Sequence, residues 1–226
     1  MIPYNPVDRA DLPKRKKYKG KAYSVDTAFE LVDKIKGDVL EPAVILGLYY
    51  GLRRSEVLGL RWSDIDYKSG TIHIQNTVVR YTTTVECEQT KSDTSNRTLY
   101  IIPETKDYFL DLRKRQQEAK LLLGSSYYDN DHVCRHNDGT PFKPNYISKR
   151  FSDLLKKYDL PHIRFHDLRH TAGSLLLDSK MSIKQIQEYL GHDQVSTTLD
   201  IYAHLSLEGK KEPAMMMGKI LSRSTA

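Results

Sequence analysis

A chain of 226 residues can bury one substantial hydrophobic core, and 39% hydrophobic with 28% charged residues is an ordinary balance for a soluble fold. No apolar run approaches the roughly 20 residues that cross a bilayer, and the first residues lack the pattern of a signal peptide. We therefore expect a cytoplasmic protein without membrane contacts. A net charge of +6 favours an anionic partner, of which nucleic acid is one class.

Residues 1–22 are predicted to form a basic linker. Asn5-Pro6 and Leu12-Pro13 interrupt this stretch, and hardly any helical or strand periodicity is present in it. Lysines and one arginine crowd the part between Lys14 and Lys21. Two interpretations stay open for this run of charge: a solvated linker, and a strap that lies on a phosphate backbone.

Three helices are predicted next in the chain. Apolar residues at helical spacing place the first over 25–36, with Ser24 as its N-cap. A second, more buried helix covers 41–50, and Gly51 ends it. A third helix is expected to start near Ser55, whose own side chain can cap it, and to end before the sequence Trp-Ser-Asp.

The pattern then changes to runs of β-branched and aromatic residues between 70 and 102, which predict a small antiparallel sheet. A turn over 91–96 separates its last two strands. The helices expected after the sheet cover 103–123, 144–157, 167–178, 182–190, 196–204 and 213–221. The predicted fold class is therefore mainly α with one small inserted antiparallel β-sheet (α+β).

The segment Gly-Leu-Arg-Arg-Ser-Glu at 51–56 places Arg53 at the entrance of the third helix. Free backbone amides at a helix N-terminus and a guanidinium attract the same anion, so Arg53 is a candidate phosphate ligand. The alternative for this segment alone is a surface arginine that pairs with Glu56.

The segment His-Asp-Leu-Arg-His at 166–170 offers an imidazole and a guanidinium on one helix face, because His166, Arg169 and His170 are spaced i, i+3 and i+4. It fits a metal site, a capped structural helix, or a phosphate site built by His166 and Arg169. The arginine and the lack of a third ligand argue against zinc. Cys87 and Cys134 also lack nearby ligands, so we expect reduced thiols and neither metal nor cofactor.

Two further segments supply groups that phosphoryl transfer needs. Leu-Gly-His at 190–192 is followed ten residues after His192 by Tyr202. Attack of a tyrosine on a phosphate creates extra negative charge, which two arginines and flanking imidazoles can stabilise without a metal. Lys91 lies in the turn, across from Arg97. Such a lysine is usually only solvated, but a long flexible amine also suits protonation of a departing 5′ oxygen.

In this order, Arg, Lys, His-x-x-Arg, Leu-Gly-His and Tyr, the chain resembles the tyrosine recombinases of the phage integrase family. The likeness is strongest to integrases of conjugative transposons and temperate phages of Gram-positive bacteria. It covers Lys21 to about Leu207. The stretches that carry it are GLRRSEVLGLRWSDID, HDLRHTAGSLLL and LGHDQVSTTLDIYAH.

The resemblance implies a role for each matching residue. Arg53 and Arg169 would clamp the scissile phosphate, and Tyr202 would be the nucleophile. His166 and His192 would assist in proton handling and hydrogen bonding. Lys91 would be the general acid. Glu56 matches an acidic residue that supports the arginine-bearing turn, Arg54 is expected to face elsewhere, and His170 to lie behind the reacting groups.

The resemblance also implies a domain organisation and partners. Residues 23–208 would form the catalytic domain, and a tail helix within 209–226 would be exchanged between protomers or packed on its own domain. We expect the chain to lack the core-binding domain that relatives usually carry and the arm-binding domain that many of them have. The implied partners are double-stranded DNA, a homotetramer on synapsed DNA, and an accessory excision or host DNA-bending protein.

Three functions stay open at this stage. The first is a site-specific recombinase that cuts and rejoins strands through a 3′-phosphotyrosyl bond, for integration and excision of a mobile element. The second is a type IB topoisomerase, which shares the chemistry but relaxes supercoils without synapsis. The third is a DNA-binding module that does not cleave.

Overall fold

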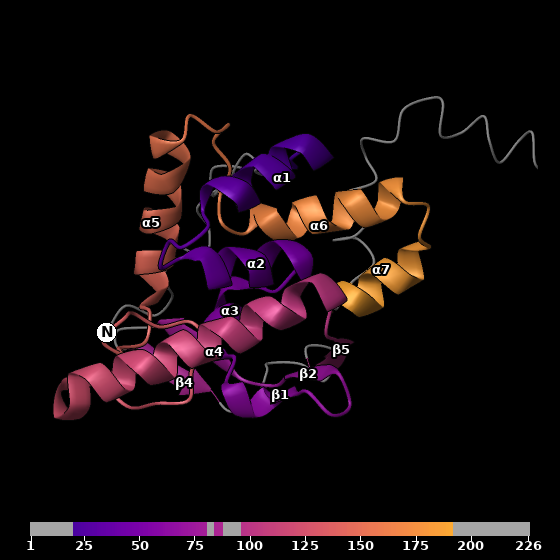
Figure 1. Ribbon diagram of the computed structural model, residues 1–226. Helices are drawn as coiled ribbons and strands as arrows, with labels where there is room; N and C mark the ends of the chain where they lie inside the picture. The colour runs from indigo at the N-terminus through magenta and orange to yellow at the C-terminus, as the bar shows by residue number, and fades with distance from the viewer. Residues whose placement is uncertain (1–19, 81–83, 88–95, 192–226) are drawn as a thin grey trace, which may run out of the picture.

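The computed structural model describes residues 20–80, 84–87 and 96–191 (Figure 1). The helices are α1 (Val25–Lys34), α2 (Glu41–Tyr49), α3 (Arg54–Gly59), α4 (Pro103–Leu123), α5 (Pro144–Lys157), α6 (Asp167–Asp178) and α7 (Ile183–Leu190), with short 3-10 helices η2 (Trp62–Asp64) and η4 (Gly124–Ser126). The strands are β1 (Ile65–Asp66), β2 (Thr71–Ile74), β3 (Thr77–Arg80), β4 (Thr84–Cys87) and β5 (Arg97–Tyr100). The predicted class, mainly helical with short antiparallel strands, is confirmed.

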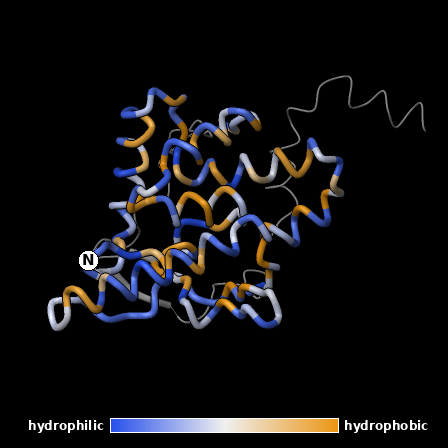
Figure 2. The backbone as a smooth tube through the Cα atoms, viewed as in Figure 1, coloured by the Kyte–Doolittle hydropathy of each residue, from blue (hydrophilic) through white to orange (hydrophobic). Residues whose placement is uncertain are grey.

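Helix α2 lies at the centre of the fold. All its residues from Glu41 to Leu48 are buried, as expected for a helix that is apolar on every side. Helices α1, α3 and α6 pack against it. Figure 2 shows α2 as mainly hydrophobic and the long α4 as largely hydrophilic where it crosses the face of the molecule. Gly51, at a φ of +61°, follows the last turn of α2 and confirms the predicted end of this helix.

The strands are divided between two antiparallel ladders. Strands β1, β2 and β5 form one sheet in that order, and β3 pairs with β4 in the other. The expected separation of the last two strands by a turn does not make them a hairpin, because β4 pairs with β3 and β5 pairs with β2. Arg97 lies opposite Ile74 in the second pairing. The segment that contains Lys91 therefore connects two ladders.

Helix boundaries follow local capping chemistry. Ser24 accepts a hydrogen bond from the Thr27 amide at 3.3 Å, as predicted, and proline occupies the first turn of both α4 and α5. The prediction that Ser55 caps α3 is wrong. Helix α3 begins one residue earlier, and Arg53 is its N-cap, whose amide donates to the Glu56 carboxylate at 2.9 Å.

Some of the remaining structural predictions concern described residues, and others lie outside them. The expected helices over 103–123, 144–157 and 167–178 are confirmed, and α7 begins one residue after the expected start at 182. The expected helices over 196–204 and 213–221 lie outside the described residues. Cys134 is a buried free thiol. Within residues 20–80, 84–87 and 96–191, no helix is both long and apolar enough to cross a bilayer.

Candidate active site

Half of the predicted site lies within the described residues. These are Arg53, His166 and Arg169, at the N-terminal ends of two different helices. The other predicted site residues, Lys91, His192 and Tyr202, lie outside the described ranges. The geometry that follows therefore concerns the arginines, the first histidine and the groups that hold them.

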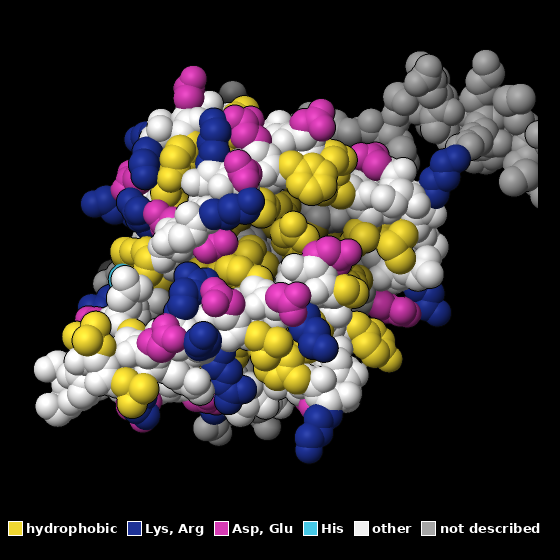
Figure 3. Space-filling view, in the orientation of Figure 1, with side chains coloured by type: hydrophobic (Ala, Val, Ile, Leu, Met, Phe, Trp, Pro, Cys, Tyr) yellow, Lys and Arg dark blue, Asp and Glu magenta, His cyan; other side chains and the backbone are white. Residues whose placement is uncertain are grey.

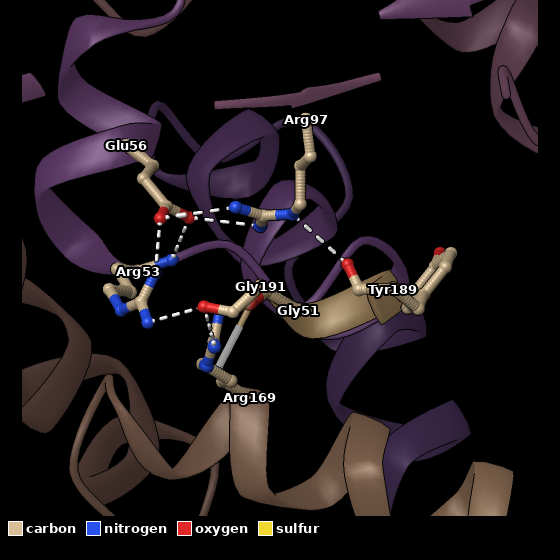
Figure 4. Close-up of polar contacts among 7 residues, drawn as sticks. All are labelled: Gly51, Arg53, Glu56, Arg97, Arg169, Tyr189 and Gly191. Carbon is tan, nitrogen blue, oxygen red and sulfur yellow. Dashed lines mark hydrogen bonds and ion pairs between the residues drawn. The ribbon is translucent and has the colours of Figure 1, made fainter. Parts of the chain in front are cut away.

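Arg53 is fixed by its position as the N-cap of α3. Its Nη1 donates to Oε1 of Glu56 at 2.7 Å, and its Nη2 donates to the carbonyl oxygen of Gly191 at 2.6 Å (Figure 4). The side chain remains 28% exposed. Arg53 thus does pair with Glu56, as the simpler interpretation expected, but it also reaches the end of α7. An arginine held on two sides and still partly open can receive an anion.

Arg169 reaches the same carbonyl group from a different helix. It lies in the first turn of α6 and is 2% exposed. Its Nη1 donates to the carbonyl oxygen of Gly51 at 2.8 Å, and its Nη2 donates to that of Gly191 at 3.4 Å. The two arginines that the sequence pairs as phosphate ligands therefore meet at one oxygen atom.

Glu56 is the buried anion that organises this cluster, with 1% of its surface exposed. Arg97, on β5, donates to both of its carboxylate oxygens, at 3.3 and 3.1 Å. Burial raises the pKa of Glu56, but Arg97, Arg53 and Arg169 outweigh it and hold the pKa below its ordinary value. The Glu56 carboxylate is therefore ionised in the folded protein at neutral pH.

His166 is the N-cap of α6, and its ring packs edge-on against that of His170 at a centroid distance of 5.2 Å. Burial and the neighbouring His170, Arg169 and Arg53 lower the pKa of His166 to about 4, against a smaller opposite effect of Asp167. His166 is therefore neutral at pH 7 and can both donate and accept a hydrogen bond. Among the described residues, no cluster of three His, Cys, Asp or Glu could hold a metal ion.

A cleft of about 720 Å³ opens beside Arg53 and His166. Its other wall is the polar side of α5, with Asn145, Ser148 and Ser152. The expectation that Arg54 faces elsewhere is wrong: it lines the same cleft, and its Nη1 donates to Ser148 Oγ at 2.6 Å. The N-terminal end of α3 therefore presents two neighbouring guanidinium groups to the cleft.

Two glycines allow α7 to approach the arginines so closely. Gly51 packs on Leu190 so tightly that a Cβ at this position would overlap the leucine side chain. Gly191 has a φ of +67°, and a Cβ there would lie 2.8 Å from Nη1 of Arg97. Both positions need a left-handed backbone and space that a side chain would fill.

The role of Arg97 was missed in the sequence, where it was noted only as a neighbour of the predicted turn. The signal was strand alternation. Arg97 and Leu99 have the same parity in β5, and Leu99 is buried, so the arginine points to the covered side of its sheet. A nearby acidic side chain stabilises a buried arginine, and Glu56 is an acidic residue among apolar helical residues.

Comparison with known proteins places the chain in a family. The model of the phage integrase family matches residues 30–208. The chain is 28% identical over 199 residues to a protein named tyrosine recombinase XerC-like from Caldanaerobacter subterraneus, covering 81% of this chain and 50% of that protein. It is 29% identical over 190 residues to the transposase from transposon Tn916 of Enterococcus faecalis, covering 80% and 46%.

The fold is shared with a solved structure at lower identity. The Tn1549 transposon integrase, solved in complex with transposon right end DNA, superposes with a TM-score of 0.76 at 20% identity, over 96% of this chain and 71% of that one. The chain spans about half the length of the curated relatives it matches.

Proposed function

Because the chain belongs to the phage integrase family, we propose that it is the catalytic part of a site-specific recombinase that integrates and excises a mobile element. The observation that carries this proposal is the meeting of Arg53 and Arg169 at one carbonyl oxygen beside a polar cleft. Two guanidinium groups at this separation can bind both non-bridging oxygens of a phosphodiester.

In the proposed reaction, the Tyr202 hydroxyl oxygen attacks the scissile phosphorus and the bond from phosphorus to the 5′ oxygen breaks. Lys91 donates a proton to that oxygen, which leaves as a free 5′-OH. Arg53 and Arg169 stabilise the charge on the phosphorane, and neutral His166, with His192, holds the phosphate oxygens or relays protons. The 5′-OH of a second strand then attacks the phosphorus of the 3′-phosphotyrosyl group; a new phosphodiester forms, the bond from phosphorus to the Tyr202 oxygen breaks, and the tyrosine regains its proton. The bond energy is conserved, so ATP is not needed.

A nicked suicide substrate tests this proposal. The unaltered chain should form a covalent DNA adduct that survives denaturation, and the adduct should form equally in excess EDTA. Tyr202→Phe should abolish the adduct and change DNA affinity by no more than about 3-fold, because only the reacting oxygen is lost. Tyr100→Phe, at an exposed tyrosine on β5, is the matched control. An adduct with Tyr202→Phe would assign the nucleophile to another residue.

A second assay separates recombination from its alternatives. Two duplexes with different labels should exchange strands if the protein is a recombinase. A type IB topoisomerase would relax supercoils without exchange, and a binding module would form no adduct. The names of the relatives, an integrase and transposases among them, favour exchange.

The assignment of Lys91 as general acid requires a test by leaving group. A 5′ thiolate leaves without protonation, whereas an alkoxide needs a proton. Lys91→Ala should therefore cleave a normal phosphodiester slowly and recover on a substrate with sulfur at the bridging 5′ position. Arg53→Ala should not recover, because sulfur does not replace a donor to the phosphorane. A lysine variant that is equally slow on both substrates would be a DNA-positioning variant.

We propose that the active form is a tetramer on two synapsed DNA duplexes, acting in the cytoplasm with an accessory excision or DNA-bending protein, and that the tail within 209–226 docks on a neighbouring protomer. An apolar groove between α1 and α6 offers a surface of suitable chemistry, lined by Val25, Phe29 and Leu176, where hydrophobic side chains gather in Figure 3. Phe29 is 65% exposed.

Deletion of the residues after Lys211 tests the tail. It should impair strand exchange more than first-strand cleavage, and Phe29→Asp should do the same if the groove is the acceptor. Glu30→Asp, on the same helix, is the control. Unchanged assembly on DNA after the deletion would contradict the docking.

A further inference from the structure

Arg97 connects three parts of the site that are distant in sequence. Its guanidinium binds both carboxylate oxygens of Glu56, which in turn binds Arg53. Its Nε donates to the carbonyl oxygen of Tyr189 at 3.0 Å, in the last turn of α7. The side chain is 8% exposed, so these contacts are shielded from water. An arginine bound on two edges has little rotational freedom.

The Glu56 carboxylate accepts hydrogen bonds from the guanidinium groups of both Arg97 and Arg53. Without Arg97, Arg53 would be the arginine that still hydrogen-bonds to the buried carboxylate, and it would be drawn towards Glu56 to replace the missing charge. Arg53 would then turn its donors away from the cleft. With Arg97 in place, one edge of Glu56 is already neutralised, and Arg53 can use Nη2 on the Gly191 carbonyl group.

The second function of Arg97 is to hold the end of α7. The Tyr189 carbonyl group accepts from Arg97, and two residues later the Gly191 carbonyl group accepts from Arg53 and Arg169. The residue that follows is His192. The same turn is also tied to α2, because the Tyr189 hydroxyl donates to the carbonyl oxygen of Tyr49 at 2.8 Å. The contacts of the Tyr189 and Gly191 carbonyl groups involve the arginines, whereas the contact between the Tyr189 hydroxyl and Tyr49 does not.

We propose that Arg97 is a positioning residue for phosphate activation, which orients Arg53 through Glu56 and sets the end of α7 against both clamp arginines. Arg97 acts through Arg53 and does not touch the phosphate itself. The inference rests on the proposed strand-cleavage function. It assigns a role to a residue at the far end of the Lys91 segment, on a strand that does not line the cleft.

The test compares two suicide substrates in single-turnover cleavage. One has the normal scissile phosphodiester, and the other has a methylphosphonate, in which an uncharged methyl group replaces one non-bridging oxygen. Arg53 offsets the charge of that oxygen, so loss of the Arg53 side chain should slow cleavage of the neutral substrate less than cleavage of the phosphodiester. Arg53→Ala provides this reference. The measured quantity is the rate on methylphosphonate divided by the rate on phosphodiester, which does not depend on the fraction of folded protein.

Arg97→Gln should slow phosphodiester cleavage about 100-fold and raise this ratio at least about 10-fold above that of the unaltered chain, with DNA affinity within about 3-fold. The ratio for Arg97→Lys should lie between those of the unaltered chain and Arg97→Gln, because lysine keeps the positive charge but cannot donate to both carboxylate oxygens as the planar guanidinium does. If Arg97→Gln is insoluble, Arg97→Lys decides by the same ratio. Tyr189→Phe removes only the tie between α7 and α2, so its ratio should equal that of the unaltered chain.

An unchanged ratio for the Arg97 variants would overturn the inference, whether or not their rates fall, because a purely structural loss slows both substrates alike. A raised ratio for Tyr189→Phe would also overturn it, since any loosening of α7 would then suffice. Failure of the unaltered chain to form an adduct would instead reject the proposed function. The two failures are therefore distinguishable.

Discussion

The N-terminal ends of α3 and α6 bring an arginine to the same carbonyl oxygen by different means. At α3, Arg53 is the N-cap, is 28% exposed, and is balanced by the Glu56 carboxylate. At α6, Arg169 is 2% exposed, and its guanidinium donates to the backbone carbonyl oxygens of Gly51 and Gly191. One arginine is hydrogen-bonded to a carboxylate at the edge of the cleft, and the other is buried and hydrogen-bonded to two backbone carbonyl groups.

Two residues with the same proposed chemical role can therefore contribute differently to the stability of the fold. Arg53 can be removed while Glu56 keeps Arg97 as a partner. Removal of Arg169 leaves a cavity and takes its donor from the Gly51 carbonyl group, while the Gly191 carbonyl group keeps Arg53. The variants below use this contrast, beginning with the one expected to have the largest effect.

Arg169→Ala should impair both stability and cleavage. We expect the free energy of unfolding to fall by roughly 3 kcal/mol, because a large buried side chain and its hydrogen bonds are lost. Urea denaturation monitored by circular dichroism measures this change. Arg169→Lys, which keeps the charge, should recover part of the stability and little of the cleavage rate. An Arg169→Ala protein as stable as the unaltered chain would remove the contrast.

Arg53→Ala should separate rate from stability. Its cleavage rate should fall by about 100-fold or more, as expected for a lost donor to a developing charge. The free energy of unfolding should change by only about 1 kcal/mol, since the side chain is partly exposed and Glu56 retains Arg97. Denaturation and suicide-substrate assays on the same preparation measure both. Equal destabilisation by Arg53→Ala and Arg169→Ala would show that the two ends are built alike.

Acid should affect the α6 end through His166. The pKa of His166 is about 4 in the folded chain and near its ordinary 6.5 when unfolded, so the unfolded state binds more protons between these values. Stability contributed by neutral His166 is full above pH 6.5 and is lost as pH falls towards 4. The loss should be of the order of 2 kcal/mol.

Comparison with His166→Gln isolates this contribution from other groups. The variant should lose less stability than the unaltered chain between pH 6.5 and pH 4, as measured by urea denaturation at several pH values. The carboxylate at the α3 end, Glu56, has a lowered pKa and should stay ionised through most of this range. Parallel stability curves for the two proteins would argue against a neutral, buried His166.

Arg54→Ala should give the smallest effect. Arg54 is exposed and contacts Ser148 across the cleft, so stability should change by no more than about 0.5 kcal/mol. If the side chain meets a DNA phosphate, affinity should fall a few-fold and the slope of log affinity against log salt should flatten by about 0.9. Cleavage at saturating DNA should be unchanged. A slower rate at saturation would move Arg54 into the reacting site with Arg53.

Local chemistry predicted most of the helices, while contacts between distant segments had to come from the structure. The N-cap Ser24 located α1, and the sequence also predicted α4 and α5, each of which has a proline in its first turn. The cap of α3 was misassigned because the Glu56 carboxylate competes with the nearer Ser55 hydroxyl. Strand runs were visible, but their pairing is decided by tertiary packing, so the partner of β5 could not be read from its own residues.

The site followed the same division. Motif spacing singled out Arg53, His166 and Arg169, and the structure brings the two arginines together. Motif spacing did not reveal that both arginines contact the Gly191 carbonyl group, because the position of a backbone oxygen cannot be read from residue types. Burial of His166, which lowers its pKa, likewise depends on packing that no short motif encodes. The assignments of Lys91, His192 and Tyr202 stay predictions.

The close packing of Gly51 on Leu190 has a consequence for how this sequence can change over evolutionary time. A side chain at position 51 would overlap that leucine, and the backbone there is left-handed. Substitution at either position thus alters the selection on the other, although the two are far apart in the chain. Among homologues, a residue larger than glycine at position 51 should occur only together with a shorter one at position 190. A shorter residue at position 190 would remove the overlap but not the left-handed backbone, so substitution of Gly51 meets two separate constraints.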